Sequence, residues 1–266
     1  MTRRKLKNMI WNAENYLQFA AERTQPALDL ITRLRVPDAR HIIDIGCGPG
    51  NSTAALRNRW PDAEIIGLDN SPPMIESARN AFPEENWILA DAANWTAHKT
   101  FDVVFSNAAL QWLKHHETLI PYLLSQVSSG GALAVQMPAH HDSGLHRETL
   151  EVAENEIWCD RMESARLSLT KHPPAFYYDL LQPISARIEI WETEYIHVLE
   201  NPRAILNWFR ATGLRPFLEV LNNEEKARFE SLLLEKYERK YPRQKDGRVL
   251  FAFRRLFFIA YKSTPE

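Results

Sequence analysis

The stretch His41-Ile42-Ile43-Asp44-Ile45-Gly46-Cys47-Gly48-Pro49-Gly50-Asn51 decides the fold of this chain. An apolar run of strand character ends near an acid and gives way to a glycine-rich turn, and a helical pattern follows over residues 52–59. Glycines let the backbone approach a ligand closely, and the free N–H groups of a helix N-terminus point toward it. The stretch therefore predicts a strand, a tight turn and a helix that form a pocket for a polar or anionic group.

The spacing of the glycines separates this turn from a dinucleotide-binding turn. Such turns follow their strand with the pattern Gly-x-Gly-x-x-Gly. Here the glycines are Gly46, Gly48 and Gly50, and Pro49 lies between the last two. The proline and the closely spaced third glycine argue against a pyrophosphate site, so an NAD-linked oxidoreductase is the least favoured interpretation.

Strand-like and helical segments alternate along the first half of the chain. Apolar runs that indicate strands cover residues 41–45, 64–69, 86–90, 101–106 and 131–137, and helical segments lie near 51–59, 71–81 and 109–128. This alternation is typical of a parallel sheet with helices on both faces. Residues 132–135 are apolar throughout, as expected for a strand that is buried on both sides.

The character of the chain changes after residue 137. Two further strand candidates, 187–196 and 250–261, bracket amphipathic segments at 202–211 and 223–241. We expect these strands to complete a doubly wound α/β fold with seven mostly parallel strands and a helical cap. The expected parts are an N-terminal segment with an α/β core at 1–137, a cap or substrate region with the sixth strand at 138–249, and the last strand with the tail at 250–266.

Polar side chains follow successive strand candidates. Asp44 lies near the end of the first strand, Asp69 ends the second, Asp91 follows the third and Asn107 follows the fourth. In an open α/β sheet, ligands bind beyond the carboxyl ends of the strands. Each acid could instead cap the next helix or begin a turn. Their combination with the glycine turn favours a cofactor site.

The form Asp-x-Gly-x-Gly-x-Gly resembles motif I of the class I S-adenosylmethionine (SAM)-dependent methyltransferases. This resemblance implies that Asp69 accepts from the ribose hydroxyls of SAM and that Asp91 accepts from the adenine amino group. It places Met74 against the adenine ring, the glycine turn at the amino-acid end, and Asp44 near the cationic amino group and sulfonium. The other residues proposed to bind the cofactor are Asn70, Ala92, Asn107 and Arg23.

After the fourth strand the chain continues with Ser106-Asn107-Ala108-Ala109-Leu110-Gln111-Trp112. Methyltransferases that modify exocyclic amines usually carry Asn/Asp-Pro-Pro-Tyr at this place. The difference argues against a DNA or RNA amine and favours the small-molecule or carboxyl type. Trp112 either belongs to the core or forms a wall of the methyl-transfer pocket.

Short segments along the chain are typical of one family. They are residues 16–19 (YLQF), 22–27 (ERTQPA), 44–53 (DIGCGPGNST), 107–112 (NAALQW), 133–138 (LAVQMP), 211–216 (ATGLRP) and 254–257 (RRLF). With them the chain resembles the trans-aconitate 2-methyltransferase family over nearly its whole length. It departs from that family at Ala139-His140, where an Asp-Asn type of pair is usual, and in a longer, histidine-rich segment at 139–172.

This resemblance implies SAM-dependent methylation of a carboxylate of a small polycarboxylic acid, most simply trans-aconitate, with a monomethyl ester and S-adenosylhomocysteine as products. A carboxylate is already ionised near neutral pH, so we expect no catalytic residue beyond the groups that bind and orient the reactants. Arginine suits such an anion because its planar fork binds a carboxylate at two points. The candidates for substrate binding are Arg215, Arg255, Tyr177, Tyr178 and Trp112, with Arg23 as a third cation. Arg215 could instead be a solvated turn residue, and the tyrosines could belong to the core.

Composition limits the other functions. The chain has 266 residues and a net charge of −2, so it carries no global electrostatic footprint for nucleic acid. It contains no run of 18 apolar residues that would span a membrane. Two cysteines give no disulfide framework, and His140, His141 and His146 match no zinc signature, so we expect no metal. We expect a cytoplasmic monomer or weak dimer.

Two other functions stay open at this point. The protein could methylate a malonyl group on a carrier protein, which predicts a basic docking patch for an acidic partner. It could also be a SAM-binding regulator without turnover, which predicts no product with any acid. The sequence does not decide which acid or which carboxyl group is methylated.

Overall fold

The computed structural model describes residues 20–139, 143–170, 172–210 and 212–264. Within them, seven strands form one sheet in the order β3-β2-β1-β4-β5-β7-β6. The strands are β1 (His41–Ile45), β2 (Glu64–Asp69), β3 (Asn86–Leu89), β4 (Phe101–Asn107), β5 (Val127–Pro138), β6 (Arg187–Leu199) and β7 (Val249–Tyr261). β7 is antiparallel to both β5 and β6, and the other pairs are parallel. The predicted fold class is confirmed.

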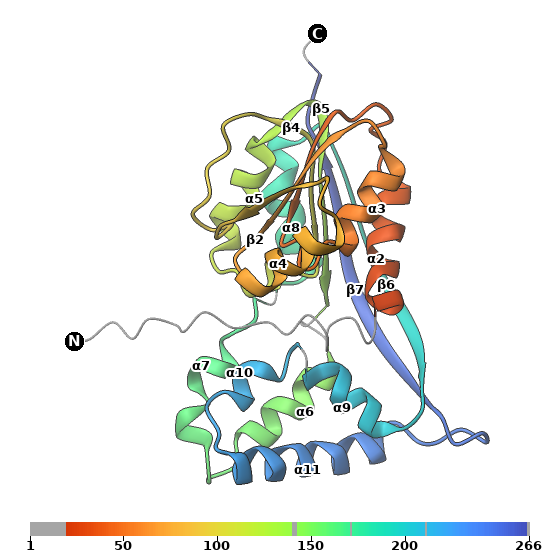
Figure 1. Cartoon of the computed structure of the whole chain (residues 1–266). Coiled ribbons are helices and arrows are strands. Elements are labelled where there is room, and N and C mark those ends of the chain that lie inside the picture. Colours follow the sequence, from red (N-terminus) through yellow and green to blue (C-terminus); the bar gives the residue numbers. More distant parts are fainter. Residues whose placement is uncertain (1–19, 140–142, 171, 211, 265–266) are drawn as a thin grey trace.

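Helices cover both faces of this sheet (Figure 1). On one face, α2 (Ala20–Arg33) and α3 (Asn51–Arg59) bury a core that includes Ala132 and Ala134 of β5. On the other, α5 (His116–Ser125) and α8 (Pro174–Leu181) bury a core that includes Leu133 and Val135. Successive side chains of a strand point to opposite faces, so an apolar strand supplies both cores. α4 (Pro72–Ala81) packs beside β2 and β3.

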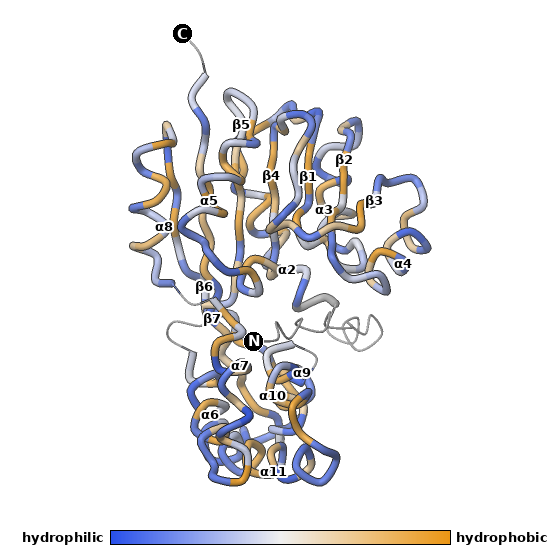
Figure 2. Tube along the Cα trace, turned by 90° about the vertical axis from the view of Figure 1, so that its left-hand side faces the viewer, coloured by the Kyte–Doolittle hydropathy of each residue, from blue (hydrophilic) through white to orange (hydrophobic). Residues whose placement is uncertain are grey.

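The remaining helices form a separate layer, which we call the helical unit. Its members are α6 (Gly144–Ala153), η3 (Cys159–Arg161), α7 (Glu163–Arg166), α9 (Pro202–Arg210), α10 (Arg215–Leu218) and α11 (Asn223–Lys240). They enclose their own apolar core, which contains Trp158, Phe209, Phe217 and Phe229. β6 and β7 run from the sheet into this unit, and Figure 2 shows the helical unit below the carboxyl ends of the parallel strands.

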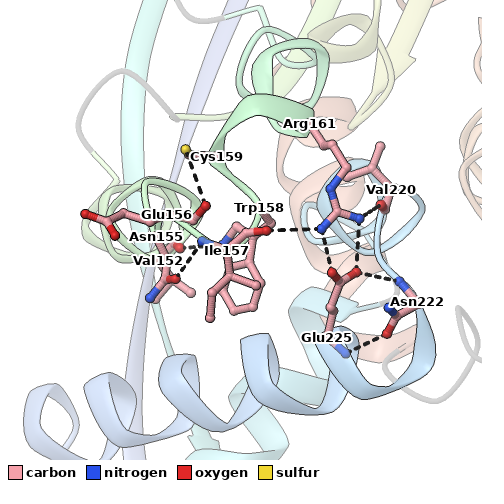
Figure 3. Close-up of polar contacts among 10 residues, drawn as sticks. All are labelled: Val152, Asn155, Glu156, Ile157, Trp158, Cys159, Arg161, Val220, Asn222 and Glu225. Atoms are coloured by element: carbon pink, nitrogen blue, oxygen red, sulfur yellow. Dashed lines mark hydrogen bonds and ion pairs between the residues drawn. The ribbon is translucent and has the colours of Figure 1, made fainter.

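Within the helical unit, hydrogen bonds join η3 to the N-terminus of α11 (Figure 3). The side chain of Asn222 accepts from Glu225 N at 2.9 Å, and Glu225 Oε2 accepts from Asn222 N at 2.9 Å, which is a capping box. Arg161 of η3 donates to both carboxylate oxygens of Glu225, at 3.1 and 2.5 Å. One carboxylate therefore caps α11 and holds η3 against it.

One predicted helix is divided in the structure. The helix predicted at 109–128 is divided into η1 (Leu110–Trp112) and α5, because Leu113 is extended and His115 is left-handed at φ 59°. An L-residue in that conformation does not continue an α-helix. The segment around Pro173 and Pro174 forms α8, since proline is favoured at the first helical position.

The expected cap at 138–249 contributes to both layers. It supplies α8, η4 (Gln182–Ile184) and β6 to the sheet layer, whereas the helical unit comes from residues 144–166 and 202–240. Every helix within the described residues is too short or too polar to cross a bilayer.

Candidate active site

The glycine turn after β1 has a backbone that side chains would disturb. Gly46 and Gly48 are left-handed, with φ of 72° and 56°. A Cβ on Gly46 would lie 2.1 Å from the Cβ of Ala109, whereas Gly48 faces open space. Gly46 N and Cys47 N both donate to Leu68 O, at 2.7 and 3.1 Å, and so tie the turn to β2. The turn is a rigid cradle whose open side faces a pocket.

Asp44 lies beneath this turn and is fully buried. Its Oδ2 accepts from Ser52 Oγ at 2.6 Å and Thr53 Oγ1 at 2.7 Å, which joins β1 to the first turn of α3. Within the described residues, its Oδ1 has no hydrogen-bond partner. Burial raises the pKa of this carboxyl to about 6, against the hydrogen bonds that lower it. A nearby cationic ligand would favour the ionised form.

Two further acids lie at strand ends and serve turns as well. Asp69 accepts from Gly48 N at 3.0 Å and Ser71 N at 2.8 Å, while burial raises the pKa of its carboxyl. Asp91 accepts from Ala93 N at 3.0 Å. Both acids also line the pocket described next. The turn-forming role and a ligand-binding role are therefore compatible.

The strand-end pocket encloses about 1000 Å³ of empty space, including its open mouth. Eight of the residues predicted to bind the cofactor line it: Gly46, Gly48, Asp69, Asn70, Met74, Asp91, Ala92 and Asn107. The Asn107 Oδ1 atom is buried and has no hydrogen-bond partner in the part of the chain that the structure describes. A pocket lined by two acids, Asp69 and Asp91, with a spare acceptor oxygen suits a ligand that carries positive charge and N–H donors.

A second pocket of about 560 Å³ adjoins the first, between the sheet and the helical unit. We call it the adjoining pocket. Ala108 and Trp112 line both pockets. Ala108 is left-handed at φ 54°, a conformation that costs about 1–2 kcal/mol for an L-residue. Such strain tends to persist where the surrounding structure imposes it.

Two buried arginines give the adjoining pocket its charge. Arg23 of α2 is 7% exposed and Arg255 of β7 is 4% exposed, and both line this pocket. Arg23 donates to Trp208 O at 3.3 Å and lies 5.4 Å from the centre of the Trp208 ring. The Arg255 guanidinium lies 4.4 Å from the Phe253 ring centre. Aromatic rings and a backbone carbonyl thus hold two cations at the wall of an open space.

Comparison with known proteins identifies the family. Residues 42–131 match the model of a methyltransferase domain. The chain is 42% identical over 252 residues to a trans-aconitate 2-methyltransferase of Azoarcus sp., covering 95% of this chain and 99% of that one. It is 45% identical over 258 residues to a Methylobacterium radiotolerans protein of the same name, covering 96% and 99%. The chain belongs to the trans-aconitate 2-methyltransferase family. The resemblance seen in the sequence is confirmed.

Solved structures support the fold. The YcgJ protein of Bacillus subtilis matches with a TM-score of 0.60 at 11% identity, over 91% of this chain and all of that one. A Haemonchus contortus phosphoethanolamine N-methyltransferase 2, solved with S-adenosylhomocysteine, matches with a TM-score of 0.60 at 15% identity, over 95% of this chain and 57% of that one. The layered sheet of this family member is thus that of class I methyltransferases.

Some predicted cofactor residues of this family member lie outside the strand-end pocket. Asp44 is beneath the turn, and a Cβ on Gly50 would face Phe82 at 2.8 Å rather than the pocket. Arg23 lines the adjoining pocket and a small pocket behind the glycine turn. Asp44 and Gly50 support the turn from below and behind, and a role of these three residues toward the cofactor stays a prediction.

The predicted acid-binding residues are only partly brought together. Arg255 and Trp112 line the adjoining pocket. Arg215 is not among the lining residues and forms an ion pair with Glu219 at 3.3 Å on α10. Thr212 and Gly213, just before it, line the pocket. Burial lowers the pKa of the Arg215 guanidinium.

The two tyrosines are not brought to either pocket. Tyr177 is buried on α8, where its hydroxyl lies 2.8 Å from His116 Nδ1 and its ring stacks on Phe258. Tyr178 is 50% exposed on the same helix. Neither tyrosine is among the residues that line the pocket of Arg23 and Arg255, so donation to substrate carboxylates stays a prediction.

Several residues of the adjoining pocket were not singled out from the sequence. They are Gln111, Pro138, Trp208, Phe209, Thr212, Gly213 and Phe253. Gln111 and Pro138 stand in segments typical of the family, and Trp208 lies on an amphipathic helix, but these signals do not say which pocket a residue faces. No group of three metal-ligating side chains occurs within the described ranges. His146 is buried in α6, and His140 and His141 lie outside those ranges.

Proposed function

We propose that this protein is a SAM-dependent carboxyl O-methyltransferase that converts trans-aconitate into a monomethyl ester, with S-adenosylhomocysteine as the second product. The observation that carries the proposal is the pair of pockets. A strand-end pocket lined by Asp69 and Asp91 shares Trp112 and Ala108 with an adjoining pocket that holds two buried arginines. The names of the curated relatives at 42–45% identity support this activity.

The residues of the strand-end pocket fit SAM, which supplies a methyl group on a positively charged sulfur. The glycine cradle leaves room for a ligand beside Gly48. Burial raises the pKa of both Asp44 and Asp69, so their ionised forms would gain from a nearby cation. Asn107 Oδ1 is placed to accept from a donor. We propose that Asp69 binds the ribose hydroxyls, Asp91 the adenine amino group and Met74 the adenine ring, with Asn70 and Ala92 beside them.

The adjoining pocket fits the acid. Arg23 and Arg255 would each pair with a carboxylate, and their burial strengthens these contacts because water is excluded. Two cations leave one carboxylate of a tricarboxylic acid without a strong partner. We propose that this third carboxylate faces Trp112 and Ala108, on the side of the strand-end pocket. It is ionised at neutral pH, so the chain contributes orientation and desolvation rather than a general base.

Further expectations from the sequence stay proposals. They are that the protein acts in the cytoplasm, that it is a monomer or a weak dimer, and that it has no nucleic-acid partner. The division into parts at 1–137, 138–249 and 250–266 also stays a prediction.

The test is incubation of the purified protein with methyl-labelled SAM and a panel of acids. We expect a base-labile methyl ester on trans-aconitate, and much less on cis-aconitate, isocitrate, citrate or itaconate. Ester formation on malonyl carrier protein alone would support the carrier-protein alternative. Binding of SAM without an ester on any acid would contradict the proposed activity and support a regulator.

A further inference from the structure

We propose that Thr170 and His116 are positioning residues for methyl transfer, because they fix the turn 109–114 that separates the two pockets. The inference rests on the proposed function. Neither residue is among those that line the strand-end pocket or the adjoining pocket in the described part of the chain, so both would act through the backbone of the turn. Thr170 reaches it from the segment that leaves the helical unit, and His116 reaches it from the sheet layer.

The turn forms much of the wall between the pockets. Leu110, Trp112 and Leu113 line the strand-end pocket, and Gln111 and Trp112 line the adjoining pocket. Its own closing bonds are short-range: Trp112 N donates to Ala109 O at 3.0 Å, and Leu113 N donates to Leu110 O at 2.9 Å. A single 3₁₀ turn has poor hydrogen-bond geometry and little stability of its own. Contacts from outside the turn therefore set the position of Trp112.

The first outside contact comes from His116, which is fully buried at the start of α5. Its Nε2 lies 2.9 Å from Leu110 O, and its Nδ1 lies 2.8 Å from Tyr177 Oη. A carbonyl oxygen can only accept, so Nε2 donates, and Nδ1 of the neutral ring accepts from the tyrosine hydroxyl. Burial lowers the pKa of His116, which favours this neutral form. In this arrangement the Tyr177 hydroxyl donates to His116, and His116 donates to Leu110 O, so both ring nitrogens have a partner.

The second set of contacts comes from residues 167–170, which follow α7. Thr170 N donates to Gln111 O at 2.8 Å, and the Thr170 hydroxyl donates to Leu113 O. Nearby, Lys114 Nζ donates to Leu167 O. α7 is anchored in the helical unit, because Ala165 is part of the apolar core there. The wall between the pockets is therefore bonded to both layers of the molecule.

This arrangement bears on the reaction because methyl transfer depends on alignment. The acid oxygen must approach the methyl group in line with the bond that breaks, and a misplacement of about 1 Å can cost about 100-fold in rate. Trp112 faces both reactants' pockets, so a small shift of the turn changes their relative placement. Loosening the turn should lower the rate with little change in the stability of the fold.

The test uses Thr170→Val, which keeps the shape of the side chain and removes the hydroxyl donor. We expect kcat with trans-aconitate to fall about 10-fold, since alignment is loosened rather than lost, while Tm and the Kd for SAM change little. Thr170→Ser should restore most of kcat. Thr118→Val is the matched control, because the Thr118 hydroxyl donates to His115 O at 3.1 Å, outside the wall; its kcat should equal that of the wild type.

A second variant and a second readout keep the outcome clear. Tyr177→Phe removes the donor to His116 and should lower kcat in the same way. Hydrogen exchange at the Trp112 and Leu113 amides should be faster in Thr170→Val, but unchanged in Thr118→Val, whether or not the acid is a substrate. Unchanged exchange and kcat in Thr170→Val, or a failure of serine to restore them, would overturn the inference. An inactive wild type with faster exchange in Thr170→Val would instead contradict the proposed function.

Discussion

The strand-end pocket and the adjoining pocket meet at Trp112 but differ in charge and in construction. The first is lined by Asp69, the last residue of β2, and by Asp91, two residues after the end of β3. The second is lined by Arg23 and Arg255, which come from opposite ends of the sequence. Under the proposed function, a cationic cofactor and an anionic acid would have separate sites of opposite charge. The difference shows that one site is built by local segments and the other by the assembly of the whole chain.

The largest effect is expected from a variant that alters the adjoining pocket and leaves the strand-end pocket intact. Arg255→Met removes a buried cation and keeps much of the side-chain volume. Truncating one member of a buried charged pair costs about 2–5 kcal/mol, so kcat/KM for trans-aconitate should fall about 30- to 4000-fold. The Kd for SAM, measured by calorimetry, should stay within a factor of about three, which is well under 1 kcal/mol.

The matched control for this variant is Arg254→Met. Arg254 is the next residue, and its guanidinium is 3.9 Å from Glu192 and 3.7 Å from Glu194, on the other face of the strand. It should leave kcat/KM nearly unchanged. Equal losses in the two variants would show that the adjoining pocket does not bind the acid.

Asp69→Asn should instead weaken the binding of SAM and leave the binding of the acid unchanged. The change removes a charge at the strand-end pocket and keeps one of the two oxygens of Asp69, which accept separately from Gly48 N and Ser71 N. Hydrogen bonds to charged groups contribute about 1.5–3 kcal/mol, so the Kd for SAM should rise about 10- to 100-fold. KM for the acid at saturating SAM should change little. Asp62→Asn, at an exposed position outside the pocket, is the control; a similar loss there would contradict the assignment.

A smaller effect should appear in the pH dependence of SAM binding. Burial raises the pKa of Asp44 to about 6, and a cation binds better to its ionised form. Below pH 6 the carboxyl takes up a proton, so the Kd for SAM should rise by up to about 10-fold per pH unit. Calorimetry from pH 5 to 8 would measure this. Asp44→Asn should remove the dependence, and a flat wild-type profile would contradict the role of Asp44.

The raised pKa of Asp44 should affect the stability of the ligand-free protein in the opposite direction: SAM binding improves as the pH rises, whereas stability decreases. The folded state holds the Asp44 proton more tightly than the unfolded chain, whose carboxyl has a pKa near 3.8. The contribution of Asp44 to the free energy of unfolding should therefore decrease as the pH rises from about 4 to about 6. Subtracting the profile of Asp44→Asn isolates this contribution in denaturant titrations. A difference that grows with pH over this range would refute it.

The smallest effect is expected far from both pockets. Arg161→Ala breaks the ion pair with Glu225 in the helical unit, where the arginine side chain is 44% exposed. Exposed pairs of this kind contribute about 0–1 kcal/mol, so thermal unfolding should shift only slightly. Neither the Kd for SAM nor kcat/KM for the acid should change. A change in either quantity would mean that the contact between Arg161 and Glu225 affects the geometry of the pockets.

The sheet was predictable from the sequence because its strands are locally encoded. β1 and β2 have the predicted bounds, since strands buried on both faces are continuous apolar runs between turn signals. The glycine turn and the acids near the strand ends were also predictable, because they lie next to the strands in the sequence. The break between η1 and α5 was not, because the left-handed conformation of His115 leaves no mark in an apolar pattern that fits a helix.

The adjoining pocket was predictable only in part. Arg255 was proposed from its residue type and the family resemblance, and it lines the pocket. Tyr177 was proposed on similar grounds and is instead buried between α8, to which it belongs, and the sheet. What separates them is the face of the sheet on which each side chain lies, and that depends on how β6 and β7 return to the sheet. Local patterns do not contain this information.

β6 and β7 have a consequence for how the molecule unfolds. Each has 13 residues, and both pass through the two layers. Phe251 and Phe253 of β7 belong to the core of the helical unit, whereas Phe257 and Ile259 belong to the core under α2. If β7 were detached, both layers would lose part of their apolar cores. We therefore expect a single cooperative unfolding transition, in which binding of a ligand to the sheet layer also protects the helices around α11 from unfolding.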